Sequence, residues 1–238
     1  MKNRQAIGVL GGMSPLASRN MYDRLIQLSM QYFGAIKNDD FPEIILHSIP
    51  VPDFISNSKD KYRAFDMLKD RVKDLNKLNI SCLSIACNTA HVLLEDLQII
   101  SKAPFMSMID EVVKTVVSNK IKKIGILGSP LIIRSRLYQS RLEKFNIDSI
   151  VPNNTQQQVL DRIIRNVISG DITKKDSKLL SSIADELVSR GARGIILGCT
   201  ELPIIFPLQY KITVYNSVEI LSMALLRRYY ESNKINTV

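Results

Sequence analysis

Residues 7–15 read IGVLGGMSP and residues 124–130 read IGILGSP, so one short apolar stretch occurs twice in the chain. Each copy stops at glycine and is followed by small residues and a proline. A continuous apolar run of this length is typical of a buried parallel strand. Serine followed by proline is typical of a helix start. We therefore predict a strand–turn–helix unit at each position, with Ser14 as the N-cap of the first helix and Pro15 as its first residue.

Two further pairs of segments repeat in the same order. ACNT at residues 86–89 matches GCTE at residues 198–201, and residues 107–111 resemble residues 214–219 more loosely. Three matches in order at similar spacing indicate two similar halves related by a pseudo-twofold axis. Clefts between domains are common ligand sites. We therefore expect the active site in the cleft between the halves.

Short apolar runs alternate with longer periodic segments along the whole chain. We predict strands at residues 6–10, 44–48, 81–86, 105–108, 123–127, 194–197 and 212–215. Helices lie between them, among them one that Thr173 opens with a capping box and Gly191 ends. The pattern predicts an α/β protein of two open parallel-sheet domains, Rossmann-like or flavodoxin-like. Residues 1–102 with about 213–238 are expected to form the first domain, and residues 103–212 the second.

Composition and charge favour a protein that acts on small molecules. The 238 residues are 45% hydrophobic and carry a net charge of +9, and the basic residues are scattered. A nucleic-acid surface usually needs a basic stripe or a known module, and we see neither. The chain contains no run of eighteen apolar residues, which a membrane span would need. Its first residues do not resemble a secretory signal. We expect a cytoplasmic protein without a nucleic-acid or membrane partner.

The cysteines and histidines do not suggest a metal site. Three cysteines and two histidines occur, and no C-x-x-C spacing is present, which argues against zinc and against a redox pair. We therefore expect free thiols and no metal. Cys82 lies five residues before Cys87 on the same predicted strand, and this odd spacing places it on the opposite sheet face. We interpret Cys82 as a core residue.

Cys87 and Cys199 occupy matching positions in the two halves, each just after a predicted strand. Ligands bind beyond the carboxyl ends of parallel strands, so the pseudo-twofold axis would bring the two thiols to opposite sides of one cleft. Racemisation removes a proton from one face of a carbon and returns one to the other face. It needs a thiolate and a thiol whose pKa values lie near the operating pH. A helix N-terminus after each cysteine is expected to lower the thiol pKa.

Small polar residues beside the thiols are candidates for binding a substrate's carboxylate and ammonium groups. The glycines of the first loop would also allow a ligand close to the backbone. The substrate-binding candidates are Gly12, Met13, Ser14, Asn88, Thr89, Ser129, Thr200 and Glu201. His91 follows Cys87 closely, and we interpret it as a hydrogen-bonding support of the site rather than a base. We assign His47 no role.

These motifs together resemble the aspartate/glutamate racemase family, whose order and approximate spacing they share. The resemblance rests on residues 7–15, on CNTAH at residues 87–91 and on GCTE at residues 198–201. It implies two α/β domains, a cleft active site, a homodimer, and a two-base mechanism without cofactor in which Cys87 and Cys199 are the bases. It also implies that Ser129 contacts an amino-acid substrate, aspartate or glutamate.

Three positions depart from the family pattern. Ser14 replaces a common glycine, and Phe54 and Ile168 stand where aspartate-selective members carry a cation for the side-chain carboxylate. A racemase of another amino acid or of hydantoins and a maleate isomerase stay open, whereas the two retained cysteines argue against a one-cysteine decarboxylase. A small-ligand sensor on the same scaffold is the non-enzymatic alternative, and a nucleotide-binding regulator is disfavoured because phosphate-loop signals are absent.

Overall fold

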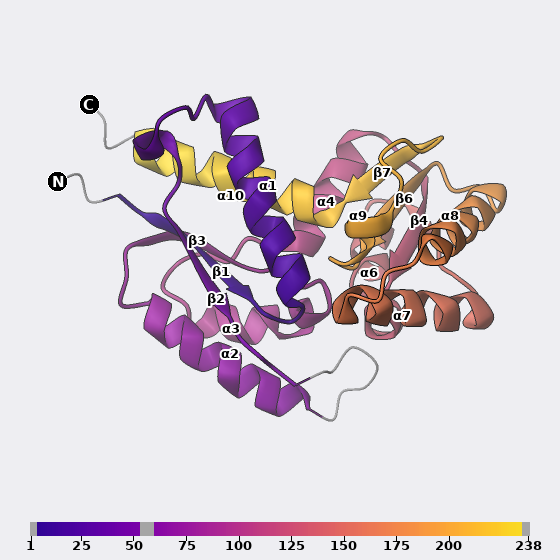
Figure 1. Ribbon diagram of the computed structural model, residues 1–238, viewed down its shortest axis with the longest axis horizontal. Coiled ribbons are helices and arrows are strands. Elements are labelled where there is room, and N and C mark those ends of the chain that lie inside the picture. The colour runs from indigo at the N-terminus through magenta and orange to yellow at the C-terminus, as the bar shows by residue number, and fades with distance from the viewer. Residues whose placement is uncertain (1–3, 53–59, 235–238) are drawn as a thin grey trace.

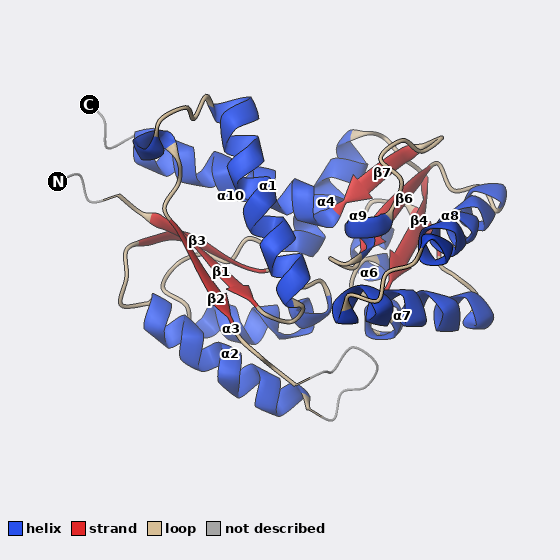
Figure 2. Ribbon diagram, viewed as in Figure 1, coloured by secondary structure: helices blue, strands red, loops and turns tan. Residues whose placement is uncertain are grey.

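Two parallel sheets, each covered by helices on both faces, make up the computed structural model, which describes residues 4–52 and 60–234 (Figure 1, Figure 2). The first sheet has the order β2-β1-β3 and the second the order β5-β4-β6-β7. The strands are β1 (Ala6–Gly11), β2 (Ile44–Ser48), β3 (Ile80–Ile85), β4 (Lys123–Gly128), β5 (Asp148–Ile150), β6 (Gly194–Gly198) and β7 (Thr213–Asn216). The two repeated sequence stretches are therefore β1 and β4, and equivalent neighbours flank both strands.

Six of the seven predicted strands are confirmed to within one residue at each end. The prediction for residues 105–108 is wrong, because only Phe105 forms an isolated parallel bridge, with Leu83. Ser107 instead caps the next helix by accepting a hydrogen bond from the Asp110 amide at 3.1 Å. Strand β5 was not predicted from the sequence.

Helices cover both faces of each sheet and bury four apolar clusters, two for each sheet. Helices α1 (Pro15–Phe33) and α10 (Ser217–Lys234) pack on one face of the first sheet, and α2 (Lys61–Leu75) and α3 (Leu94–Ile100) pack on the other. The second sheet is covered by α4 (Met108–Ser118), α6 (Gln139–Glu143), α7 (Asn154–Ser169) and α8 (Lys174–Ser189). The short helices α5 (Pro130–Arg134) and α9 (Leu202–Ile205) and two 3-10 turns, Asn38–Asp40 and Thr89–Leu93, complete the described elements.

Two helices cross between the halves. Helix α4 follows the first sheet but packs against the second, and α10 follows the second sheet but packs against the first. The two helices also contact each other. The predicted division placed residues 213–216 in the first domain, whereas β7 pairs with β6 in the second sheet. The domain boundaries otherwise stay a prediction.

Local sequence signals explain how the elements near the site begin and end. The Ser14 hydroxyl accepts a hydrogen bond from the Ala17 amide at 3.3 Å, which confirms the predicted N-cap of α1. Thr173 and Asp176 form the predicted capping box of α8, and Gly191 follows that helix with a φ of 99°. Gly12 has a φ of 89°, and a Cβ there would lie 2.2 Å from the backbone nitrogen of Ile49. The loop after β1 can therefore close against its neighbour only with glycine at this position.

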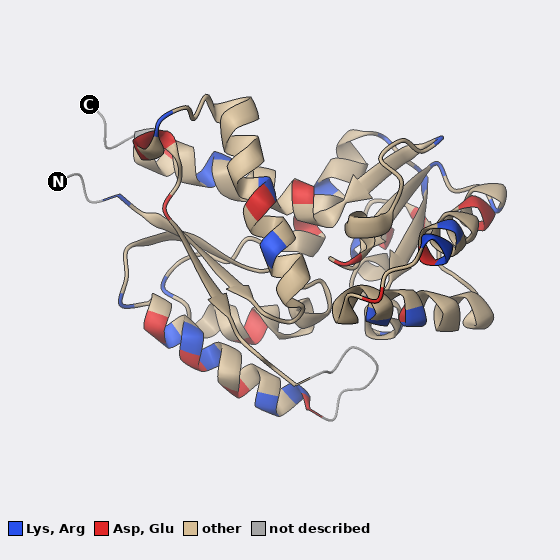
Figure 3. Ribbon diagram, viewed as in Figure 1, with Lys and Arg blue, Asp and Glu red and all other residues tan. Residues whose placement is uncertain are grey.

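Residues of both charge signs are interspersed along the described helices and loops (Figure 3). Lys, Arg and Asp alternate along α2, for example, where Lys69 pairs with Asp66 and Arg71 pairs with Asp74. Within residues 4–52 and 60–234, no helix is long and apolar enough to cross a membrane.

Candidate active site

Cys87 and Cys199 lie beyond the carboxyl ends of equivalent strands. Cys87 follows β3 by two residues and Cys199 follows β6 directly, and each of these strands is a neighbour of the repeated central strand. Both thiols are free and nearly buried, with 8% and 5% of the residue surface exposed. Cys82 packs with the residues under α1 and α10 on the other face of the first sheet, as predicted.

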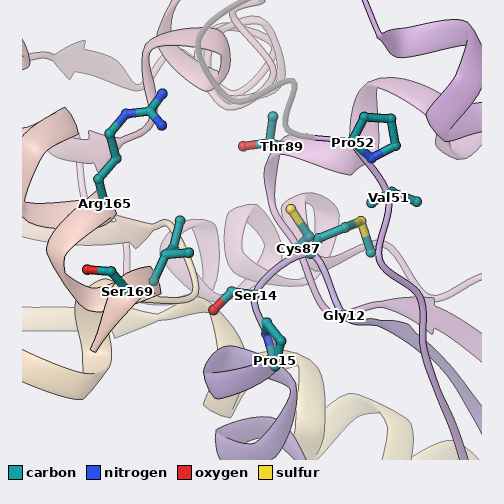
Figure 4. Close-up of a pocket in the computed structure, with 11 residues that line it drawn as sticks. Gly12, Ser14, Pro15, Val51, Pro52, Cys87, Thr89, Arg165 and Ser169 are labelled. Atoms are coloured by element: carbon teal, nitrogen blue, oxygen red, sulfur yellow. The ribbon is translucent and has the colours of Figure 1, made fainter. Parts of the chain in front are cut away.

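A cavity of about 260 Å³ lies between the halves, and Cys87 is part of its wall. The first half contributes the loop after β1, the segment after β2 and the segment after β3, whereas α7 contributes the facing wall. The described lining residues are Gly12, Met13, Ser14, Pro15, Val51, Pro52, Cys87, Thr89, Arg165, Ile168 and Ser169. Figure 4 shows Cys87 in the interior, with Arg165 and Ser169 opposite Val51 and Pro52.

The predicted site residues divide into two groups. Those that line the cavity are Cys87, Gly12, Met13, Ser14 and Thr89. Those that are buried but do not line it are Cys199, Asn88, Ser129, Thr200 and Glu201. The first group belongs entirely to the first half of the chain, and most of the second group belongs to the second half. A ligand in this cavity would therefore meet Cys87 first.

A buried carboxyl group holds the thiol of Cys199. The Sγ of Cys199 donates a hydrogen bond to Glu201 Oε2 at 2.9 Å, and the Thr200 hydroxyl donates to the same oxygen at 3.2 Å. The Ser14 side chain acts in the direction of lowering the pKa of Glu201, so the first loop lies near this carboxyl group of the second half. Burial raises the pKa of Glu201, and burial together with the adjacent carboxylate raises the pKa of Cys199 well above its usual range. This arrangement favours the protonated thiol at Cys199.

Cys87 has different hydrogen-bond partners. The backbone N–H groups of Ala90 and Thr89 and the Thr89 hydroxyl act on its sulfur and favour the thiolate. Burial outweighs them and, together with the charge of Glu201, raises the pKa of Cys87 to about 12. The expectation that a helix N-terminus leaves both thiols with lowered pKa values is therefore wrong. The helical segments that follow are short, and desolvation has the larger effect.

The two sulfur atoms influence each other electrostatically. The charge of Cys87 contributes to the raised pKa of Cys199, and Glu201 acts on both thiols. Such an electrostatic interaction is strongest between groups that lie close together in a poorly solvated environment. The fold therefore brings together two cysteines from opposite halves, with one carboxyl group beside them.

A buried hydrogen-bond chain connects the halves next to Cys87. The Tyr138 hydroxyl donates to Asn88 Oδ1 at 2.6 Å, Asn88 Nδ2 donates to Ser217 Oγ at 3.1 Å, and Ser217 Oγ donates to the Leu197 carbonyl at 2.8 Å. The side chain of Asn88 is thus engaged on both sides. Tyr138 was not predicted as a site residue, because it is distant in sequence from every motif.

A second contact between the halves joins Thr89 and Ser129. Their hydroxyl oxygens are 2.9 Å apart. Ser129 is fully buried and also accepts a hydrogen bond from the Ile132 amide at 3.3 Å, which caps α5. Of these two hydroxyl groups, only that of Thr89 belongs to a residue of the cavity wall.

His91 supports the backbone at Cys87 and does not contact the thiol through any described hydrogen bond. Its Nδ1 lies 2.8 Å from the Cys87 carbonyl oxygen, and its Nε2 accepts a hydrogen bond from the Met108 amide at 2.9 Å. Because Nε2 is an acceptor, the proton lies on Nδ1, which donates to the carbonyl. Burial lowers the pKa of His91 to about 4, so the ring is neutral around pH 7. The sequence-based interpretation as a hydrogen-bonding support agrees with these contacts.

Replacing Tyr138 with phenylalanine tests the buried chain. Tyr138→Phe leaves Asn88 Oδ1 without its donor in a buried environment, so we expect the free energy of unfolding to fall by about 1–3 kcal/mol. Urea unfolding measures this loss. Tyr210→Phe is the matched control, because its hydroxyl donates to Asp185 at 2.7 Å on the exposed surface. Equal effects of the two substitutions would contradict a special role for the buried chain.

The two positions at which the family's cation is missing have different outcomes. Phe54 lies outside the described residues. Ile168 lines the cavity as an apolar residue, but Arg165, one turn earlier on α7, lines it too. Sequence inspection missed Arg165, although helix periodicity was the signal that could have found it. Residues three and four positions apart share a helix face.

Sequence comparison identifies similar proteins over nearly the whole chain. The family model described as Asp/Glu/Hydantoin racemase matches residues 10–225. The broad specificity amino-acid racemase RacX of Bacillus subtilis is 26% identical over 224 residues, which cover 94% of this chain and 97% of that protein. A glutamate racemase of Leptospira interrogans is 24% identical and covers 84% of this chain and 72% of that protein.

Solved structures share the two-sheet architecture. An aspartate racemase homologue from Pyrococcus horikoshii has a TM-score of 0.79 at 27% identity, covering 97% of this chain and 100% of that chain. The Picrophilus torridus aspartate racemase has a TM-score of 0.84 at 24% identity, covering 95% and 94%, a likeness of fold.

Proposed function

The chain belongs to the Asp/Glu/Hydantoin racemase family and is an amino-acid racemase, and we propose that Cys87 and Cys199 racemise an acidic amino acid by two-base proton transfer. The observation that carries this proposal is the equivalence of the two cysteines. Cys87 follows β3 and Cys199 follows β6, which occupy equivalent places beside the central strands of the two sheets. Glu201 acts electrostatically on both thiols. The α-carbon of the substrate would lie between the two sulfur atoms.

The proposed reaction has two proton transfers. The Cys87 thiolate removes the α-proton of one enantiomer and becomes a thiol, and the electron pair stays on the planar α-carbon. The Cys199 thiol then protonates the opposite face and becomes a thiolate. The product has inverted configuration, and the enzyme holds the same number of protons as before. A proton must return to Cys199 and leave Cys87 before the next turnover in this direction.

The surroundings of the two sulfurs support this starting distribution of protons. Backbone and hydroxyl donors from Thr89 and Ala90 favour a thiolate at Cys87, whereas the carboxyl group of Glu201 accepts the proton of Cys199. Burial raises both thiol pKa values. A substrate ammonium group would bring a positive charge close to the sulfurs and lower both pKa values again.

The predicted substrate-binding residues take two roles in this proposal. Gly12, Met13, Ser14 and Thr89 contact the substrate from the cavity wall. The other four predicted residues hold the thiols and join the halves: Asn88, Ser129, Thr200 and Glu201. Ser14 takes both roles, because it also acts on the pKa of Glu201.

Aspartate and glutamate are the proposed substrates because aspartate and glutamate racemases recur among the similar proteins. RacX, a relative that matches nearly the full chain, is a broad specificity amino-acid racemase. A racemase with a wider amino-acid range is therefore the second candidate. Both candidates use the two thiols for both proton transfers and involve no cofactor. The homodimer and the cytoplasmic location stay predictions.

An α-proton exchange screen tests the function. The protein is incubated in deuterium oxide with each of the twenty amino acids, and NMR follows loss of the α-proton signal while chiral chromatography follows inversion. We expect exchange with inversion for aspartate, glutamate or both. Saturable binding of an amino acid without exchange would instead indicate a sensor, and exchange of hydantoins alone would indicate the hydantoin branch of the family.

A further inference from the structure

Arg165 is the one charged residue among the described residues that line the cavity. The rest of the described wall is apolar or neutral, with Met13, Val51 and Ile168 among its apolar members. A single cation in an otherwise neutral cavity attracts an anionic ligand group much more strongly than a neutral one. The charge of this wall thus already discriminates between classes of amino-acid side chain.

The position of Arg165 on α7 directs it to the cavity. Residues 165, 168 and 169 share one face of the helix through their three- and four-residue spacing, and all three line the cavity. Figure 4 shows the Arg165 side chain on the side opposite Pro52, with Cys87 between the two walls. The side chain of Arg165 is 44% exposed, which suits a group at the edge of a cavity that a ligand enters.

The contact between Arg165 and Asp161 is weak. Arg165 Nε lies 3.3 Å from Asp161 Oδ2, at the long end of hydrogen-bond distances. The other oxygen, Asp161 Oδ1, is buried and has no hydrogen-bond partner within the described part of the chain. Partly exposed pairs on one helix contribute little energy. Asp161 therefore contributes little to the energy that positions the guanidinium.

We propose that Arg165 binds the side-chain carboxylate of the substrate and makes the enzyme select acidic over neutral amino acids, an inference that rests on the proposed racemase function. The guanidinium presents its N–H donors as a planar fork that matches a carboxylate. The α-carbon would then lie beside Cys87 while the side chain of the substrate extends toward α7. Arg165 is a binding residue in this account and takes no part in proton transfer.

Matched pairs of substrates test this inference. The kcat/KM values for aspartate and glutamate are compared with those for asparagine and glutamine, which have nearly the same shape without the charge. We expect the native protein to prefer the acids. Arg165→Gln should lower kcat/KM for the acids about 10–100-fold and leave the values for the amides nearly unchanged. Arg165→Lys keeps the charge without the fork and should retain part of the preference.

Two further variants complete the test. Arg162→Gln is the matched control, because Arg162 is exposed on the same helix and does not line the cavity. Asp161→Asn removes one carboxylate that contacts Arg165 and should raise kcat/KM for the acids.

The possible failures separate the two proposals. If the native protein exchanges the α-proton of no amino acid, the racemase function proposed for these cysteines fails. If it racemises acids but Arg165→Gln and Arg165→Lys keep the native ratio of acid to amide, the function stands and the role of Arg165 is refuted. A native preference for the amides refutes it as well. Thermal melting of each variant checks that the fold is intact.

Discussion

Cys87→Ser and Cys199→Ser are each expected to lower racemisation of either enantiomer by about 10²–10⁴-fold. A serine hydroxyl keeps the approximate size of the thiol, but its proton is far too tightly held for it to serve as the base. Both directions need both groups, since the base of one direction is the acid of the other. Chiral chromatography of the product measures the loss, starting from the L and the D enantiomer separately.

The residual chemistry of the two variants identifies which face each thiol serves. A variant with one remaining thiol can exchange the α-proton only on the face that this thiol reaches. Any exchange in deuterium oxide should therefore be confined to one enantiomer, and to the opposite one in the other variant.

Cys82→Ser is the matched control for these variants. Cys82 lies on β3 and is buried on the sheet face that α1 and α10 cover, away from the cavity. Its substitution should therefore leave racemisation nearly intact. If Cys87→Ser or Cys199→Ser racemised both enantiomers like the native protein while folded, the two-base account would be wrong.

Glu201→Gln is expected to move the pH profile of kcat/KM to lower pH by about 1–3 units. The active enzyme holds one proton between two thiols, so the profile is bell-shaped and its limbs report the pair. Glu201 raises the pKa of both thiols, and for each of them burial has the larger effect. Removing the carboxylate therefore lowers both thiol pKa values, and each limb moves toward acid.

The pH profile separates a charge effect from a structural one. Glutamine has the shape of glutamate and its amide oxygen can still accept the proton of Cys199, so a merely structural role would leave the limbs in place. Tyr138 and His91 stay neutral around pH 7, because burial raises the pKa of the tyrosine and lowers that of the histidine. Glu219→Gln is the control, since Glu219 pairs with Arg24 at the surface. Unchanged limbs in Glu201→Gln would show that residue 201 carries no charge in the active enzyme.

Equilibrium restricts where the asymmetry between the thiols can be observed. Free L and D amino acids have equal free energies, so kcat/KM must be the same in both directions at every pH. The different partners of Cys87 and Cys199 can appear only in kcat and KM taken separately. Glu201→Gln should accordingly change kcat and KM by different factors for the two enantiomers.

Much of the fold could be predicted because it follows from local pattern. The stretches that form β1 and β4 are continuous apolar runs that end at glycine, a pattern with few alternatives to a buried strand. Strand β5 could not be found, because Asp148, Ser149 and Ile150 form a three-residue edge strand without a periodic signal. Residues 105–108 resemble a strand in composition. The Ser107 side chain accepts a hydrogen bond from the Asp110 amide, however, and so forms the N-cap of α4.

The site could be predicted only in part. The internal repeat identified the two cysteines as candidate site residues, because equivalent strands bring equivalent residues to the same edge of their sheets. The partners of these cysteines depend on side-chain directions and long-range packing. Glu201 contacts the thiol of Cys199 rather than lining the cavity, and Tyr138 reaches Asn88 from 50 residues away in sequence. Glu201 lies two residues from Cys199 in the GCTE motif, so only the direction of its side chain was unpredictable, whereas the contact of Tyr138 has no local sequence signature.

Deuterium content at low conversion tests the central claim most directly. The native protein is incubated with one enantiomer of its substrate in deuterium oxide, and mass spectrometry compares the product with the recovered substrate. Two bases on opposite faces predict deuterium in nearly every product molecule and almost none in recovered substrate, because the thiol that takes the proton does not deliver the replacement. Equal deuterium in both at the earliest times would mean that a single base serves both faces, and the account would be refuted.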